Sequence, residues 1–185
     1  MTDYKYAHLT DRSIIDITGP DSQSFLQGLI TQDITKLSSN HDMIYSALLT
    51  ANGKFLHDFF ITKPTQNHYQ FWIETKRRDD FIKRLQIYAL RADIQITDAC
   101  DQYDLYYAMG EVTDHTAYTD PRGLNGKLFQ TTSGEQPQNG IKIDLSDYYK
   151  FCMQQNTPIG SQTMPIKLAN IQQYNLEELN AIAFD

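Results

Sequence analysis

Alternating apolar and polar positions predict a strand followed by a helix near the start of the chain. In Ser13–Thr18 the apolar side chains recur with the period of two that is typical of a β-strand. The next residues, Gly19-Pro20-Asp21-Ser22, are typical of a turn and a helix start, where Asp or Ser can cap free N–H groups. Four apolar residues then recur at helical spacing: Phe25, Leu26, Leu29 and Ile30. We therefore expect an amphipathic helix that buries these four side chains.

The same alternation predicts a group of strands after a polar loop. Three strands are expected, at Ile44–Thr50, Lys54–Thr62 and His68–Glu74. Between the first two, Ala51-Asn52-Gly53 is typical of a hairpin turn, because Asn-Gly tolerates the positive φ that such turns need. Helical spacing then returns at Arg77–Leu90. Its inward side is expected to hold Phe81, Ile82, Leu85, Tyr88 and Ala89.

The second half of the chain predicts more strands than helices. Strands are expected at Asp93–Thr97, at Tyr103–Met109, and near Thr116–Thr119 and Lys127–Thr131. A surface loop follows at Ser133–Gly140, then a helix at Leu145–Gln155 and one or two helical turns around Leu176–Leu179. Strands and helices cluster without repeated βαβ units, which favours an α+β fold. A shift in composition near residue 100 predicts two subdomains, 1–100 and 101–185.

Composition narrows the class of protein. Hydrophobic residues make up 41% of the chain and charged residues 21%, as in soluble globular proteins. No apolar run approaches the ~20 residues of a membrane span, the N-terminus lacks signal-peptide order, and the two cysteines form no CxxC pair. We therefore expect a cytoplasmic protein in a reducing compartment. A net charge of −7 argues against a nucleic-acid surface, and Lys76-Arg77-Arg78 is interpreted as a solvated helix start.

Generic catalytic and ligand motifs are missing. The region from Gly19 to Gly28 lacks the spacing and the lysine of a phosphate-binding loop, and no GxGxxG occurs. The five histidines are scattered without metal-ligand spacing, so no metal site is predicted. His57 and Asp58 would point to opposite faces of one strand and cannot form a dyad with each other. Neither Cys100 nor Cys152 has the surroundings that lower a thiol pKa.

Several motifs taken together resemble one family. The segments are IDITGPDSQSFLQGLITQDI, SALLTANGKFLHDFFI, YTDPRGLNGKLF and YYKFCMQQNTPIG. In this order they are similar to the YgfZ-type folate-binding proteins, relatives of the glycine-cleavage T-protein (an aminomethyltransferase) that include an iron–sulfur cluster assembly factor. The residues that carry the family signature are Gln27, Gly28, Thr31, Asp33, Gly53, Lys54 and Asp120. We expect Gln27, Gly28, Thr31 and Asp33 first to pack and orient the corner between strand and helix, and only second to contact a ligand.

The resemblance implies a function and a set of partners. It implies the folate-binding-domain fold of the aminomethyltransferases, with antiparallel sheets and flanking helices. It also implies a tetrahydrofolate-binding accessory protein for iron–sulfur cluster assembly or repair, with an indirect effect on tRNA modification. Its partners would be iron–sulfur assembly proteins or client enzymes, without direct nucleic-acid or membrane contact. The alternative is a tetrahydrofolate-dependent aminomethyltransferase, and a third reading is a partial module that keeps the fold and binds nothing.

The resemblance also implies a folate site. The matching residues are Arg12, Asp58, Arg122, Tyr148 and Gln154. Asp58 corresponds to the aspartate that T-protein places near the folate N10 atom, and it would be the catalytic residue of an aminomethyltransferase. An ordinary outward-facing strand aspartate is the alternative for Asp58. The third helix departs from T-protein, because Cys152 and Gln154 stand where T-protein has Arg and Glu.

A cysteine motif distinguishes the YgfZ-type proteins. This motif, Lys-Gly-Cys-Tyr-x-Gly-Gln-Glu, is expected directly after Phe184-Asp185, where the given sequence ends. The C-terminal β-barrel of the family is likewise absent from the sequence. The sequence is therefore expected to be either a piece of a longer protein or a natural truncation.

Overall fold

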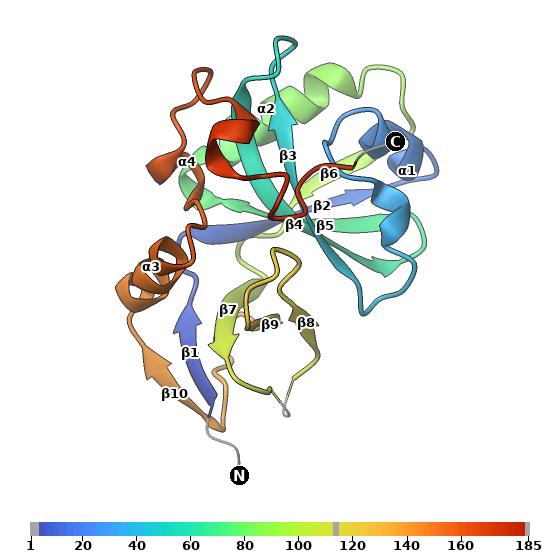
Figure 1. Cartoon of the computed structure of the whole chain (residues 1–185). Helices are drawn as coiled ribbons and strands as arrows, with labels where there is room; N and C mark the ends of the chain where they lie inside the picture. The colour runs from blue at the N-terminus through green and yellow to red at the C-terminus, as the bar shows by residue number, and fades with distance from the viewer. Residues whose placement is uncertain (1–3, 113–114, 184–185) are drawn as a thin grey trace.

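Two five-stranded sheets form the framework of the protein. The computed structural model describes residues 4–112 and 115–183. Within these residues the sheets have the strand orders β3-β4-β5-β2-β6 and β10-β1-β7-β9-β8, and helices pack beside both (Figure 1). The expected α+β class with mainly antiparallel sheets is confirmed. No helix in the described residues is long and apolar enough to cross a membrane.

The first sheet is antiparallel throughout. Its strands are β3 (Met43–Leu49), β4 (Phe55–Thr65), β5 (His68–Glu74), β2 (Arg12–Thr18) and β6 (Gln95–Asp98). One face carries the helical segments α1 (Ser22–Gln27), η1 (Ile34–Lys36), η2 (Thr75–Arg77) and α2 (Arg78–Tyr88). Leu26 of α1 and Phe81 of α2 pack there against Ile15 and Ile17 of β2, because alternate strand residues point to the same face.

The second sheet draws strands from both ends of the chain. It contains β10 (Gly140–Ile143), β1 (Tyr4–His8), β7 (Tyr103–Met109), β9 (Lys127–Thr132) and β8 (Ala117–Thr119). Only the β1–β10 pair is parallel among the described strands. The chain then forms α3 (Leu145–Gln154), α4 (Gly160–Thr163) and η3 (Ile171–Tyr174). The predicted division near residue 100 falls between β6 and β7, and two separate folding units stay a prediction.

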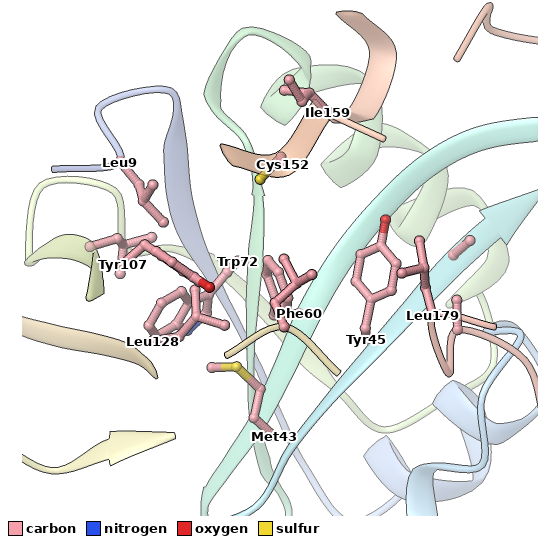
Figure 2. Packing of buried hydrophobic residues seen from close by; sticks show 14 of the residues in the cluster. Leu9, Met43, Tyr45, Phe60, Trp72, Tyr107, Leu128, Cys152, Ile159 and Leu179 are labelled. Carbon is pink, nitrogen blue, oxygen red and sulfur yellow. The ribbon is translucent and has the colours of Figure 1, made fainter. Parts of the chain in front are cut away.

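The largest core fills the space between the two sheets. Phe60 and Trp72 come from the first sheet, Tyr107 and Leu128 from the second, and all four are buried (Figure 2). Cys152 of α3 closes this core on one side. The last segment, coloured red in Figure 1, crosses the first sheet and completes the core with Leu176, Leu179 and Ala181.

Some elements differ from the sequence prediction. The strands β1 and β10 and the short helix α4 were not expected. β10 is a four-residue edge strand with no fully buried residue, so its sequence carries little strand signal. Helix α1 ends at Gln27, so Leu29 and Ile30 lie beyond it and are only half-buried, as is Phe25. Tyr88, at the last turn of α2, is 53% exposed and so does not lie on the buried side of the helix, contrary to the prediction.

Two predicted roles of polar residues were wrong. The Asp21 side chain makes no capping hydrogen bond to α1 and accepts instead the N–H of Asp93, at 2.9 Å, from the loop before β6. The Lys76-Arg77-Arg78 cluster is not wholly solvated, because the Arg77 side chain is only 10% exposed and donates to the carbonyl of Leu56. Both side chains make tertiary contacts that local sequence does not reveal.

Thr31 fastens the last segment to the first sheet. Its hydroxyl donates to the carbonyl of Ala181 at 2.6 Å and accepts the N–H of Ala47 at 2.9 Å. The backbone carbonyl of Thr31 also accepts the N–H of Ala183. This family-signature residue therefore joins three distant parts of the chain.

Thr31→Val is expected to loosen the last segment. Valine keeps the shape but leaves the Ala47 N–H and the Ala181 carbonyl without this partner, which costs about 2 kcal/mol of unfolding free energy. Urea unfolding measures the loss, and limited proteolysis is expected to cut residues 169–183 faster. Thr65→Val, at an exposed position, is the control. Equal stability of the two variants would contradict the fastening role.

Candidate functional site

Charged side chains of neighbouring strands meet inside the space between the sheets. Arg12 of β2 pairs in register with Glu74 of β5, and Asp58 lies on β4 beside them. Arg12 Nη2 lies 3.1 Å from Asp58 Oδ2, and the Tyr45 hydroxyl donates to the same oxygen at 3.0 Å. Asp58 is 2% exposed, so it is not an outward-facing strand aspartate. The strand register builds this buried ion pair.

A second buried pair faces the first from the other half of the chain. Arg122 donates to both oxygens of Asp120, at 3.0 Å from Nε and 2.7 Å from Nη2. Its Nη2 also donates to the Tyr148 hydroxyl of α3, at 3.0 Å. The guanidinium carbon lies 4.8 Å from the ring centre of Phe60 on β4. We call Arg12, Asp58, Asp120, Arg122 and Tyr148 the inter-sheet cluster.

Burial and charge act in opposite directions on the arginines of this cluster. Burial by itself would lower the pKa of Arg12, but the charges of Asp58, Asp11 and Glu74 raise it. Burial would likewise lower the pKa of Arg122, but the charge of Asp120 and its hydrogen bonds raise it well above the usual value. Both arginines therefore stay charged, and their planar groups are held in place by carboxylates.

Burial keeps the nearby hydroxyl and thiol protonated. It raises the pKa of Tyr148 well above its usual value and also raises the pKa of Cys152. The Cys152 side chain is therefore a thiol and a poor nucleophile at neutral pH. This direction agrees with the prediction that Cys152 lacks surroundings that lower a thiol pKa.

One carboxylate oxygen in the site has no partner. Asp58 Oδ1 is buried and accepts no hydrogen bond. Nearby, Glu74 is also buried and accepts the backbone N–H and the hydroxyl of Ser161. The sequence prediction missed Glu74, which ends β5 and shares its face with Trp72, Gln70 and His68. An unpartnered buried acceptor costs free energy, so Asp58 is suited to receive a donor from a ligand.

Two hollows adjoin the inter-sheet cluster. A cavity of about 10 Å³ lies beneath Pro158 and Ile159, against Arg12, Arg122 and Tyr148, and holds no more than about one water. A pocket of about 450 Å³ opens on the other side, where Tyr45 and Asp120 form part of its wall. We call them the inner cavity and the outer pocket. The unpartnered oxygen, Asp58 Oδ1, belongs to the inter-sheet cluster, whereas the larger volume belongs to the outer pocket.

The polar groups of the outer pocket are largely engaged with one another. Gln32 donates to the carbonyl of Asn180, and Asn180 donates to the carbonyl of Pro121. Asp42 accepts hydrogen bonds from Ser38 and Ser39. The outer pocket therefore offers room but few free polar groups among its described residues.

The structure brings together four of the five predicted folate residues. Arg12, Asp58, Arg122 and Tyr148 all belong to the cluster, whereas Gln154 is exposed at the end of α3. A helix turns about 100° per residue, so Gln154 cannot share the inward side of Tyr148 and Cys152. Gln154 thus contacts none of the other four through the hydrogen bonds of the described residues.

The family-signature residues hold the backbone in place. Gln27 accepts the N–H of Ile34, Gly28 ends α1, and Asp33 accepts the N–H of Thr35 at the start of η1. Gly53 has φ of +72° in the hairpin turn, and Lys54 donates to Asn170 at 2.6 Å. Apart from Asp120, these residues lie outside the cluster. Gln27, Gly28 and Asp33 thus hold the backbone around α1 and η1, and a ligand role for them stays a prediction.

His57 points away from the cluster and is buried as a neutral group. Its Nε2 lies 2.9 Å from Asp80 Oδ2, and its ring is 3% exposed beside Phe81. Burial, assisted by the positive charge of Arg77, lowers the pKa of His57 to about 4. His57 and Asp58 thus lie on opposite faces of β4 and do not act together.

The His57 pKa predicts a loss of stability in acid. The unfolded chain binds the histidine proton more readily than the folded one, so this contribution is complete above pH 6.5 and is lost as the pH falls toward 4. The expected loss across this range is about 2–3 kcal/mol. His57→Gln is expected to reduce the slope of unfolding free energy against pH. His41→Gln, at an exposed histidine, should leave the slope unchanged; equal slopes in all three proteins would contradict the prediction.

Metal-binding groups do not gather in the described residues. Within residues 4–112 and 115–183 no three His, Cys, Asp or Glu side chains lie close enough to hold a metal ion. Cys100 and Cys152 are both free thiols.

Comparison with known families decides the classification. The family described as "GCVT N-terminal domain" matches residues 7–112, which run from the end of β1 through β7 and include Asp58. The chain belongs to this family. The match covers the first sheet and one of the two ion pairs of the cluster.

Two similar curated proteins from fungi carry the same name. "Iron-sulfur cluster assembly factor IBA57 homolog, mitochondrial" of Cryptococcus neoformans is 32% identical over 108 residues, covering 57% of this chain and 28% of that protein. The protein of the same name in Coccidioides immitis is 25% identical, covering 94% of this chain and 42% of that protein. This chain spans less than half of the length of either relative. The cytoplasmic expectation is contradicted, because these relatives are named as mitochondrial.

A solved structure shares the fold. The aminomethyltransferase T of the glycine cleavage system from Bartonella henselae superposes with a TM-score of 0.51 at 17% identity. The superposition covers 57% of this chain and 28% of that one. The predicted aminomethyltransferase-like fold is therefore confirmed.

Proposed function

We propose that this protein binds a reduced folate at the inter-sheet cluster and serves as an accessory factor in iron–sulfur cluster assembly. The observation that carries the folate half is the buried, unpartnered Asp58 Oδ1 beside two immobilised guanidinium groups. The family membership and the relatives' name support the assembly half. Its partners would be assembly proteins or iron–sulfur enzymes, and any effect on tRNA modification would be indirect.

The cluster has the chemistry that a pterin needs. A pterin ring presents N–H donors that a carboxylate accepts, and a guanidinium plane can stack on it. Asp58 supplies the free acceptor, while Arg12 and Arg122 supply the charged planes. Tyr148 adds an aromatic wall from α3. The residues present therefore fit a pterin by their chemical groups.

Room for the ring requires a movement. The inner cavity of about 10 Å³ is far below the ~300 Å³ of a small ligand pocket. The segment 157–164 covers it, with Ile159 packed over the core (Figure 2). Folate would therefore bind a conformation in which this segment has moved. The measured dissociation constant would then equal that of the open conformation divided by the fraction of molecules that are open.

Titration with tetrahydrofolate tests the folate half. Asp58→Asn removes the charge and one acceptor, and we expect it to weaken binding by about tenfold or more. Lys36→Ala, in the wall of the outer pocket, is the matched control and should bind within about twofold of wild type. If only Lys36→Ala weakened binding, the folate would lie in the outer pocket. Absence of binding to the unaltered protein would contradict the folate half.

The iron–sulfur cluster content of client enzymes tests the proposed role in iron–sulfur cluster assembly. In cells that lack this protein, visible absorption of a purified iron–sulfur enzyme should show fewer clusters per chain. Restoring the wild-type gene should recover the absorption, and Asp58→Asn should recover less. Unchanged occupancy without the protein would contradict an assembly role.

A second candidate is tetrahydrofolate-dependent aminomethyl transfer. It is favoured by the same unpartnered oxygen, because an available carboxylate could assist the bond cleavage next to a folate nitrogen. Transfer of a methylene group from an aminomethyl-lipoyl carrier to tetrahydrofolate measures this activity. Turnover by the wild type that is lost in Asp58→Asn would favour the enzyme over the accessory factor.

A further inference from the structure

Glu74 is a buried carboxylate that holds two donors at once. It ends β5 and is 7% exposed. Its Oε1 accepts the backbone N–H of Ser161, and its Oε2 accepts the Ser161 hydroxyl at 2.7 Å. Lys76 also approaches Oε2, at 3.6 Å, but this lysine is 60% exposed and its pairing is weak. The main partner of Glu74 is therefore a pair of adjacent donors on one residue.

Gly160 brings the covering segment against both carboxylates. Its φ is +46°, and a Cβ placed there would lie 2.9 Å from Asp58 Oδ1 and closer still to Glu74 Oε1. The two carboxylate oxygens thus face the same point, which only a glycine backbone occupies without collision. Since Asp58 Oδ1 has no partner, the segment covers this acceptor without donating to it.

The two oxygens of the Glu74 carboxylate are adjacent acceptors that match one edge of a reduced folate. The 2-amino-4-oxopyrimidine ring presents its ring N–H and its amino N–H side by side, a pattern that a carboxylate accepts with two parallel bonds. Ser161 presents a comparable donor pair to Glu74 from the protein itself. The third helix offers no such acceptor, because Gln154 is exposed and Cys152 is a buried thiol.

We propose that Glu74, with Asp58 beside it, recognises the 2-amino-4-oxopyrimidine edge of the folate, and that Ser161 occupies this site when the ligand is absent. The inference rests on the proposed folate-binding function. The ligand's N–H pair takes the place of the Ser161 donors on Glu74, and a further ligand N–H reaches Asp58 Oδ1. The segment 157–164 is then a cap whose contact with Glu74 competes with the ligand.

Substitutions of the two partners in the Glu74–Ser161 contact should change tetrahydrofolate affinity in opposite directions. Glu74→Gln replaces one acceptor oxygen by a donor, and we expect tetrahydrofolate affinity to fall by about tenfold or more. Ser161→Ala removes a donor of the cap, so a larger fraction of molecules is open and affinity should rise several-fold. Lys76→Ala, which touches Glu74 from the solvent side, is the control and should change affinity less than about twofold. Thermal unfolding of each variant shows that it is folded.

A second ligand tests the contact between Glu74 and the pyrimidine edge separately. A tetrahydrofolate analogue without the 2-amino group should bind the wild type more weakly than tetrahydrofolate does. The same analogue should bind Glu74→Gln and the wild type with equal affinity, because the contact that Glu74 makes with the 2-amino group is missing in both cases. A purely structural Glu74–Ser161 contact would instead lower stability in both variants without a gain of affinity in Ser161→Ala. If wild type and Glu74→Gln bind tetrahydrofolate equally, the inference is wrong and the proposed function stands. If tetrahydrofolate does not bind the wild type, both are wrong.

Discussion

Arg122→Met is expected to lower the free energy of unfolding by about 3–5 kcal/mol, which is the cost of leaving one member of a buried ion pair alone. The substitution leaves Asp120 charged and 2% exposed, without the two hydrogen bonds that it now receives from the Arg122 side chain. The Tyr148 hydroxyl loses its partner as well. Chemical denaturation at neutral pH measures this loss.

A double substitution provides the control for the Arg122 prediction. Asp120→Asn removes the abandoned charge, so Arg122→Met combined with Asp120→Asn should be more stable than Arg122→Met alone. Lys127→Met tests a cation on the same half of the chain, where the Lys127 ammonium donates to the exposed Thr119. Its expected effect is within about 0.5 kcal/mol. If Arg122→Met lost as little unfolding free energy as Lys127→Met, the Arg122–Asp120 ion pair would not be important for stability.

Gly19→Ala is expected to destabilise the protein by at least about 3 kcal/mol, because backbone strain and a steric collision add together. Gly19 has φ of +128°, a region that residues with a Cβ avoid. A Cβ there would also overlap the carbonyl of Asp93 and lie 2.8 Å from the Cα of Ile94. The backbone between β2 and α1 would have to move away from the loop before β6.

Gly28→Ala is the matched control for the Gly19 prediction. Gly28 has φ of −80°, and the nearest atom to a Cβ there would be 3.8 Å away. Alanine in this conformation is expected to be neutral or to stabilise by up to about 1 kcal/mol, by restricting the unfolded chain. Thermal unfolding of the two variants side by side tests the prediction. Similar melting temperatures would show that the corner at Gly19 adapts without strain.

Most regular elements follow from local pattern. The strand predicted at His68–Glu74 has the bounds found in the structure, and Tyr103–Met109 does as well. Both strands are rich in aromatic residues, which favour β-structure, so local sequence is sufficient. The short elements β10 and α4 lack such a run, and they form through pairing with β1 and contact with Glu74.

The candidate site was predictable only in part. Four of its residues were predicted through family resemblance, but Asp58 and Arg12 become an ion pair only because β2 and β4 both flank β5. Glu74 was missed because its partner, Ser161, lies 87 residues further along the chain. Gln154 was included because the resemblance assigns a position on the helix, whereas its exposure depends on which side of α3 the core covers.

The sequence by itself determined the α+β class, the main strands and the family, because periodicity and ordered motifs are local properties of a chain. The tertiary structure alone decided which charges are buried together, which oxygen of Asp58 lacks a partner, and that Gly160 and Ser161 cover Glu74. These features depend on contacts between residues far apart in the sequence. Hydrophobic burial brings such residues together, and the low dielectric of the core then makes each unpaired acceptor costly.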